Sequence, residues 1–151
     1  RRPPRSTLFP YTTLFRSDIV LSPALGGIVV GYEIGKQLNI QTIFAERSSG
    51  KLELKRGFSI FQNSNVLIVE DVITTGKSAL ECSKIVKINK ANLVGFSCII
   101  DRSDNNVLIK EKIISQIKIN IAVFKENELP DKLKKISAIK PGSRNLSNDQ
   151  N

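Results

Sequence analysis

Two adjacent carboxylates, Glu70 and Asp71, follow the apolar run Val66–Val69 and precede a short Thr-Thr-Gly loop at residues 74–76. A helix is predicted to begin near Lys77. Carboxylates at the carboxyl end of a buried strand can bind sugar hydroxyls, and backbone N–H groups at a helix N-terminus can bind a phosphate. The stretch therefore suits a ligand with a diol at one end and a phosphate at the other, such as a ribose 5-phosphate.

Each of these features also has a purely structural interpretation. Acidic residues before a helix stabilise its dipole by roughly 0.3–1 kcal/mol, although the Thr-Thr-Gly loop after Glu70 and Asp71 favours a site. The pair Gly26-Gly27, at a predicted strand-to-helix turn, either binds a second phosphate or only forms a tight turn. Its spacing does not match the dinucleotide fingerprint G-x-G-x-x-G, and Asp71 stands where a P-loop requires glycine.

Composition narrows the class of protein. The chain has 151 residues, 40% of them apolar and 25% charged, which suits one globular domain. Histidine is absent, so catalysis by Ser-His or Cys-His pairs and zinc bound by histidine are excluded. No apolar run approaches the roughly 18 residues that span a bilayer, so we expect no membrane partner. Two scattered cysteines predict a reducing, cytoplasmic location.

The first seventeen residues differ from the rest. Residues 1–17 hold three of the six prolines, four of the 23 basic residues and no acidic residue. They match, in order, the translation of a common short-read sequencing adapter. We interpret them as an artefact outside the fold, fused to a gene fragment whose own N-terminus is missing. Without them the net charge falls from +9 to +5, which weakens a nucleic-acid interpretation of the basic charge, so we expect no nucleic-acid partner.

The elements that position the chemistry alternate between strand and helix. The predicted strands are 18–21, 41–45, 65–69, 92–100 and 118–124, and the predicted helices are 26–39, 77–88 and 107–117. Residues 47–57 are polar and basic and are predicted to form a mobile hairpin. This order predicts an α/β fold with a mainly parallel sheet in one domain, residues 18–146, followed by a disordered tail at 147–151.

Several other side chains are ambiguous from sequence alone. Arg102, after the strand at 92–100, either binds a ligand or pairs with Asp101 at the surface. The basic residues of the hairpin are either a solvated face or a set of ligand contacts. Cys82 falls on the inner face of its helix, and Cys98 falls within a strand, so both are predicted to pack in the core.

The stretch 66–78, V-L-I-V-E-D-V-I-T-T-G-K-S, resembles the phosphoribosyl diphosphate (PRPP) signature of type I phosphoribosyltransferases. Four further segments are similar to those of the orotate phosphoribosyltransferases. They are S-P-A-L-G-G at 22–27, F-A-E-R at 44–47 with L-K-R-G-F at 54–58, I-D-R at 100–102, and K-P-G-S-R at 140–144. The resemblance covers nearly all of residues 18–146.

This resemblance implies an enzyme that joins orotate and PRPP to give orotidine 5′-monophosphate and diphosphate, with Mg²⁺ held mainly through PRPP and no direct protein ligand. It implies ribose contacts from Glu70 and Asp71, orotate contacts from Thr74 and Arg102, and loop cations at Lys51 and Lys55, which with the acidic pair make up the predicted catalytic set. Further implied PRPP contacts are Ala24, Leu25, Gly26, Arg47, Val72, Ile73, Thr74, Thr75, Gly76, Lys77 and Ser78.

The resemblance also implies a homodimer in which the hairpin 47–57 closes over the neighbouring subunit's site. The N-terminal hood that covers the orotate in this family has no counterpart in the sequence, and we expect this chain to be poorly active without it. Two alternatives stay open. One is a phosphoribosyltransferase for another base, and the other is a non-catalytic regulator that uses the same fold to bind nucleotide or RNA.

Overall fold

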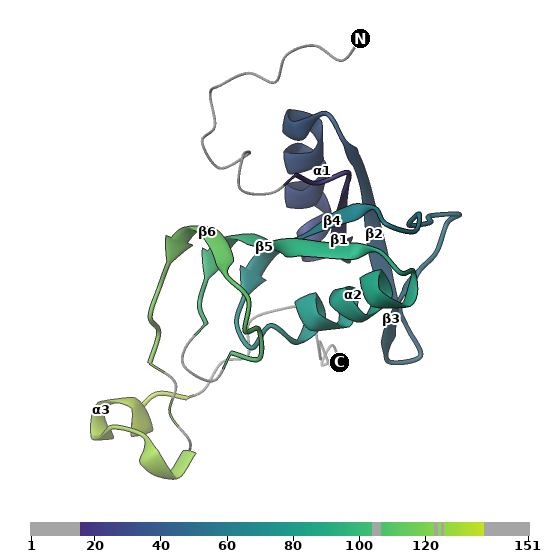
Figure 1. Ribbon diagram of the computed structural model, residues 1–151. Coiled ribbons are helices and arrows are strands. Elements are labelled where there is room, and N and C mark those ends of the chain that lie inside the picture. Colours follow the sequence, from purple (N-terminus) through teal and green to yellow (C-terminus); the bar gives the residue numbers. More distant parts are fainter. Residues whose placement is uncertain (1–15, 104–106, 123, 125, 138–151) are drawn as a thin grey trace, which may run out of the picture. The chain divides into compact units, whose positions relative to one another are not determined.

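The computed structural model describes residues 16–103, 107–122, 124 and 126–137. They fall into two units, divided after Asn120, which are described separately. The first unit contains one six-stranded sheet in the order β3-β2-β1-β4-β5-β6 (Figure 1). Its elements are β1 (Ile19–Pro23), α1 (Gly26–Leu38), β2 (Gln41–Ser48), β3 (Lys51–Leu54), β4 (Asn65–Ile73), α2 (Lys77–Ile88), β5 (Asn92–Asp101) and β6 (Ile113–Lys118).

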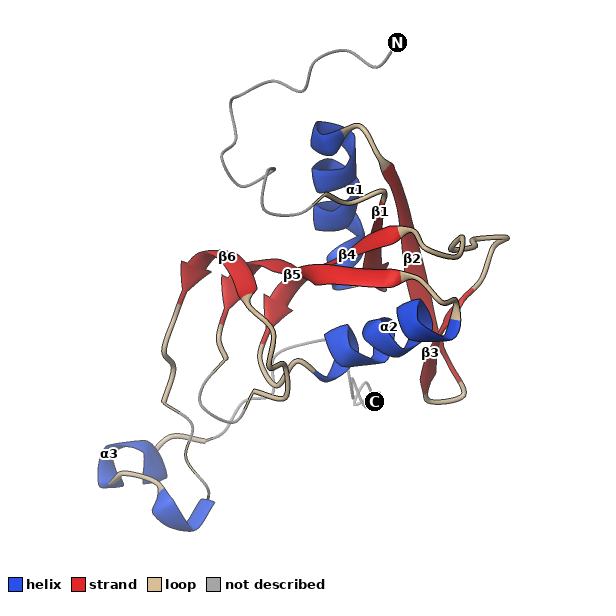
Figure 2. Ribbon diagram, viewed as in Figure 1, coloured by secondary structure: helices blue, strands red, loops and turns tan. Residues whose placement is uncertain are grey.

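The sheet is parallel except at one edge. Strands β2, β1, β4, β5 and β6 pair in parallel, and only β3 runs antiparallel, against β2. Helices α1 and α2 cover opposite faces of the sheet (Figure 2). The α/β fold with a mainly parallel sheet, which the alternation of elements predicts, is confirmed.

A stripe of glycines brings α1 close to the sheet. Gly27, Gly31 and Gly35 are the buried residues of this helix. A methyl group on Gly31 would collide with Oγ of Ser22 on β1, and a methyl group on Gly35 would collide with Oγ1 of Thr42 on β2. The helix backbone therefore approaches the sheet closely at these glycines, while Val30, Ile34 and Leu38 pack beside them against Val20, Leu67 and Val69.

Helix α2 packs on the other face through side chains. Ala79, Cys82, Ile85 and Val86 are buried, and they join the larger core with Phe96 and Ile68 of the sheet. Both cysteines are free and buried, as predicted.

The prediction is wrong after β5. Residues 107–117 do not form a helix, and no strand spans 118–124. Instead, residues 107–112 form a loop, and β6 (Ile113–Lys118) adds to the sheet edge in parallel with β5. The β-branched residues Ile113, Ile114 and Ile117 favour a strand, and pairing with β5 outweighs the helical spacing of the apolar residues.

Two predicted segments lie partly or wholly outside the described residues. Of the predicted artefact at 1–17, only Arg16, which is exposed, and Ser17, which is buried, are described. The tail at 147–151 is outside the description. The second unit includes a short helix, α3 (Asp131–Lys134), with an ion pair between Lys134 Nζ and Asp131 Oδ1 at 2.9 Å. No helix in the described ranges has the length and apolarity needed to cross a membrane.

Candidate active site

The site lies where the sheet changes its winding direction. Strand β1 sits between β2 and β4; α1 leads from β1 to β2 on one face, and α2 leads from β4 to β5 on the other. The loops after β1 and β4 therefore diverge at the carboxyl edge of the sheet, which is where α/β folds bind ligands. Both loops contain residues that the sequence predicts for PRPP.

Strand β4 is longer than predicted and carries the acidic pair within it. Its pairing with β1 stops at Ile68, whereas its pairing with β5 continues through Ile73. Glu70 and Asp71 thus lie on an extended strand, opposite β5 only, rather than in a loop beyond the strand end. They reach past the last residue that pairs with β1, so their side chains border the diverging loops.

Because side chains alternate along a strand, the two carboxylates lie on opposite faces of the sheet. Asp71 faces the N-terminus of α1, where a methyl group on Gly26 would lie 2.7 Å from its Cγ. Glu70 faces α2, and its charge contributes to raising the pKa of the Cys82 thiol, although burial is the largest cause. The pair therefore spans both halves of the crevice.

Glu70 is the titratable group of the site with the clearest shift. Burial, and next the neighbouring charge of Asp71, raise its pKa to about 7. Both causes disfavour a second negative charge in a partly desolvated place. A carboxyl group poised near neutrality at the end of a buried strand is typical of functional sites.

The loop after β4 leads into the N-terminus of α2. Gly76 caps this helix in the left-handed region, with φ of 76°, and has no side chain to cap it, whereas Thr75 Oγ1 accepts a long hydrogen bond of 3.4 Å from the N–H of Lys77. A methyl group on Gly76 would lie 2.7 Å from Cγ1 of Ile109, so the loop packs closely on the segment after β5. The N–H of Leu108 donates to the carbonyl of Thr75 at 3.0 Å, which fixes the loop. The N–H groups of the first turn that follow Lys77 suit a phosphate.

The loop after β1 is anchored to β2 and carries an exposed side chain. The N–H of Ala24 donates to the carbonyl of Ala45 at 2.8 Å, and a cis peptide bond joins Ala24 to Leu25. The Leu25 side chain is exposed. Together with Gly26, these residues form the loop that diverges from the loop after β4 at the carboxyl edge of the sheet.

Arg102 follows β5 and is exposed, with its N–H donating to the carbonyl of Ile73 at 2.8 Å. The partners found for the buried Asp101 carboxylate are Ser103 N at 2.8 Å and Lys118 Nζ at 3.3 Å. Burial raises the pKa of Asp101, but the hydrogen bonds from Ser103 and the Lys118 charge outweigh burial, and the pKa lies below its usual value. The predicted alternative, a surface pair between Asp101 and Arg102, is therefore not what holds Asp101.

The hairpin places its basic residues in different surroundings. Arg47 Nη2 lies 3.0 Å from Glu81 Oε2 of α2, and Arg47 Nη1 donates to the carbonyl of Gly50 at 2.6 Å. Arg56 binds both carboxylate oxygens of Glu46, at 2.8 and 2.9 Å. The predicted catalytic lysines, Lys51 and Lys55, are exposed. Glu81 is not among the residues predicted from the sequence, because its position beside Cys82 is the only sign of it there.

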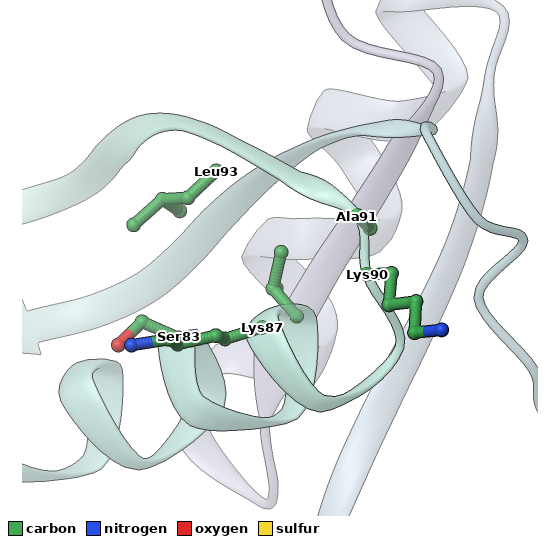
Figure 3. A pocket seen from close by; sticks show the side chains of 6 residues that line it. Ser83, Lys87, Lys90, Ala91 and Leu93 are labelled. Carbon is green, nitrogen blue, oxygen red and sulfur yellow. The ribbon is translucent and has the colours of Figure 1, made fainter.

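A separate hollow of about 490 Å³ lies elsewhere in the fold (Figure 3). Its lining comes from the last turns of α2 and the start of β5, at the amino edge of the sheet: Ser83, Val86, Lys87, Lys90, Ala91 and Leu93. It is thus at the opposite edge from Glu70 and Asp71, and it contains none of the predicted site residues. The described residues hold no cluster of three or more His, Cys, Asp or Glu side chains suited to a metal ion.

Comparison with known proteins agrees with this geometry. Residues 13–131 match the phosphoribosyl transferase domain family, so the fold and the site define a phosphoribosyltransferase. The chain is 40% identical over 127 residues to the orotate phosphoribosyltransferase of Thermoanaerobacter sp. (strain X514), covering 84% of this chain and 67% of that protein. It is 44% identical over 132 residues to that of Methylorubrum populi, covering 87% and 67%. The chain belongs to the orotate phosphoribosyltransferase family.

Among solved structures, an adenine phosphoribosyltransferase from Thermoanaerobacter pseudethanolicus superposes with a TM-score of 0.62 at 17% identity, covering 72% of this chain and 74% of that one. This likeness confirms the fold alone. It contributes nothing to the choice of base, for which the sequence relatives are the informative comparison.

Proposed function

We propose that the protein transfers the 5-phosphoribosyl group of PRPP to orotate, giving orotidine 5′-monophosphate and diphosphate in pyrimidine synthesis. The observation that carries this proposal is the acidic pair on β4, which a short loop connects to the N-terminus of α2 at the carboxyl edge of a phosphoribosyltransferase sheet. The identity of 40–44% to orotate phosphoribosyltransferases supports orotate as the base.

In this proposal the two faces of the crevice bind different parts of PRPP. Glu70 and Asp71 accept hydrogen bonds from the ribose hydroxyls. The loop from Val72 to Ser78 binds the 5′-phosphate, with Thr74 also facing the base, and the turn at 24–26 binds the diphosphate. Arg102, exposed after β5, pairs with the orotate carboxylate through a charge-assisted contact.

The reaction requires no protein nucleophile. Departure of diphosphate leaves positive charge on the ribose ring, which nearby carboxylates stabilise, and negative charge on the leaving group, which loop cations stabilise. Lys51 and Lys55 are exposed on the hairpin and supply such cations. Mg²⁺ would add charge neutralisation on the leaving diphosphate, and it would be held mainly through PRPP; the carboxylate oxygens of Glu70 and Asp71 are of the donor type that it prefers.

We further infer a cytoplasmic homodimer in which the hairpin 47–57 reaches the neighbouring subunit's site. The exposure of Lys51 and Lys55 supports this arrangement, because their side chains project from the hairpin into solvent. Light scattering would measure the oligomeric state. Mixing a Lys55→Ala variant with an Asp71→Asn variant would test whether each site uses residues of both subunits. Two defective chains that restore activity on mixing would support exchange of the hairpin between sites.

The enzyme proposal is tested by turnover with orotate and by Asp71→Asn. We expect this substitution to lower kcat/KM by roughly 10- to 100-fold, because it removes a charged acceptor for ribose, with little loss of stability. Glu33→Gln, on the exposed face of α1, is the matched control. An unchanged kcat/KM would show that Asp71 does not contribute to the site. Consumption of adenine or uracil instead of orotate would show that the substrate is another base. PRPP binding without turnover would favour a non-catalytic regulator.

A further inference from the structure

The ion pair between Arg47 and Glu81 joins the hairpin to α2 at the edge of the candidate site. Arg47 Nη2 and Glu81 Oε2 are 3.0 Å apart. The side chain of Glu81 is only 19% exposed, and its Oε2 atom is buried, whereas the side chain of Arg47 is 43% exposed. The carboxylate is therefore the more buried member of the pair: its Oε2 makes the ion pair but accepts no hydrogen bond of good geometry, and part of the guanidinium is open to solvent.

The position of Arg47 along β2 places the pair beside the crevice. The pairing of β2 with β1 ends at Ala45, opposite Pro23, so Arg47 lies two residues beyond it. Ile43 and Ala45 pack in the core on the α2 side, and alternation puts Arg47 on that same side. Arg47 thus lies at the carboxyl edge, on the face of the sheet that Glu70 also occupies.

The surroundings of Cys82 connect these groups. Besides burial, the charges of Glu70 and Glu81 raise the pKa of its thiol, and the charge of Arg47 lowers it. All three charged side chains are therefore within electrostatic reach of one sulfur atom. Glu70 of the proposed ribose site and the Arg47–Glu81 pair thus lie on the same face of the sheet.

We propose that Glu81 is a positioning residue for PRPP binding: at the base of the hairpin it holds the Arg47 guanidinium at the carboxyl edge of its own chain's sheet, where the exposed part of the guanidinium binds a phosphoryl oxygen, while the residues beyond Arg47 reach the neighbouring site. This inference rests on the proposed function. An arginine has five N–H donors in a planar fork, so it can keep the Glu81 contact and bind an anion at the same time. Without Glu81, the bond from Arg47 Nη1 to the Gly50 carbonyl at 2.6 Å remains, but it ties the guanidinium to the hairpin itself and not to α2.

A double-mutant cycle on PRPP affinity tests this role. Dissociation constants from calorimetry are compared for the wild-type protein, Glu81→Gln, Arg47→Gln and the double variant, with Mg²⁺ present throughout. We expect Glu81→Gln to weaken PRPP binding by about three- to tenfold in the wild-type background and by less than about twofold when Arg47 is already glutamine. The control is Glu33→Gln, which replaces a helical glutamate paired with Lys36 away from the site. It should leave the affinity for PRPP unchanged.

The result that would overturn the proposal is an equal effect of Glu81→Gln in both backgrounds, or a loss of thermal stability with unchanged PRPP affinity, since either shows a purely structural pair. If Glu81→Gln fails to fold, Glu81→Asp keeps the charge and shifts it, and the same comparison applies. The cycle measures binding rather than turnover. A protein that binds PRPP with this coupling but does not consume orotate would contradict the proposed reaction and leave the role of Glu81 intact.

Discussion

The α-carbon of Gly26 lies against the carboxylate of Asp71, so that a methyl group at residue 26 would be 2.7 Å from Cγ of Asp71. The contact joins the first residue of α1 to the acidic pair on β4. It exists because the glycine stripe of α1 lets the helix approach the sheet closely. The absence of a side chain at Gly26 is therefore a condition for the observed position of Asp71.

We expect Gly26→Ala to displace Asp71 and to weaken PRPP binding by at least about tenfold, because small displacements of a binding group have large effects on affinity. Stability should change by less than about 1 kcal/mol, since alanine is the better helix former. PRPP titration and thermal unfolding measure the two effects, with Lys36→Ala on the exposed side of α1 as control. Wild-type affinity in Gly26→Ala would show that Asp71 adjusts freely.

Glu70 gives the site a pH dependence. Its raised pKa means that folding favours the protonated form, so this contribution to stability is complete below the ordinary carboxyl pKa and is lost as pH rises through about 7. We expect Glu70→Gln to be more stable than wild type at pH 8, by roughly 1–3 kcal/mol, and about equal to it near pH 4. Urea unfolding across this range measures the difference. A difference that does not vary with pH would exclude Glu70 as the titrating group.

The affinity for PRPP should vary with pH in the opposite direction to the stability contribution of Glu70. Ionised Glu70 is the better acceptor for ribose hydroxyls, so wild-type affinity for PRPP should rise as pH increases through about 7. The titration of PRPP itself contributes to any such profile. Glu70→Gln is therefore compared with wild type at each pH. The dissociation constant of Glu70→Gln divided by that of wild type should rise with pH and level off above about pH 8.

The sequence predicts the two helices near the site well, and the reasons are local. Both α1 and α2 have apolar or small residues at helical spacing and a glycine at the start, and the structure confirms their bounds within one residue. The prediction for the region after β5 is wrong because pairing with β5, and not the local spacing of apolar residues, decides its structure. The opposite orientation of Glu70 and Asp71 follows from the extension of β4 to Ile73, which depends on β5 as its partner. Contacts such as Gly26 with Asp71 and Arg47 with Glu81 depend on packing between elements and leave little trace in the sequence.

Gly76 combines an unfavourable backbone angle with close packing, and Gly57 separates the two effects. Both have φ near +75°, but a methyl group on Gly76 would lie 2.7 Å from Ile109, whereas nothing lies within 4 Å of one on Gly57. We expect Gly57→Ala to destabilise the protein by about 1 kcal/mol through strain alone, and Gly76→Ala by about 1–3 kcal/mol more through overpacking. Chemical denaturation measures both, and adding Ile109→Ala to Gly76→Ala should recover part of the loss. Equal losses of stability at the two glycines would show that the Ile109 side chain moves aside without a further loss of stability.

Asp101 links the end of β5 to the backbone that carries Arg102. Its carboxylate accepts the N–H of Ser103 at 2.8 Å and pairs with Lys118 at 3.3 Å, and it is only 4% exposed. We expect Asp101→Asn to lower stability by about 1–3 kcal/mol at pH 7, because the charge-assisted contacts are lost. Since folding lowers the pKa of Asp101, its contribution is present above the ordinary carboxyl pKa and is lost as pH falls through the lowered value.

The difference in unfolding free energy between wild type and Asp101→Asn should therefore shrink toward about pH 3. Asp131→Asn removes an exposed carboxylate that pairs with Lys134, and it should leave stability unchanged within about 0.5 kcal/mol. In turnover assays, Asp101→Asn should raise KM for orotate more than KM for PRPP, because Asp101 directly precedes Arg102 and its carboxylate binds the N–H of Ser103 on the other side of Arg102. An equal rise in both KM values would mean that Asp101 supports the sheet edge in general rather than the position of Arg102.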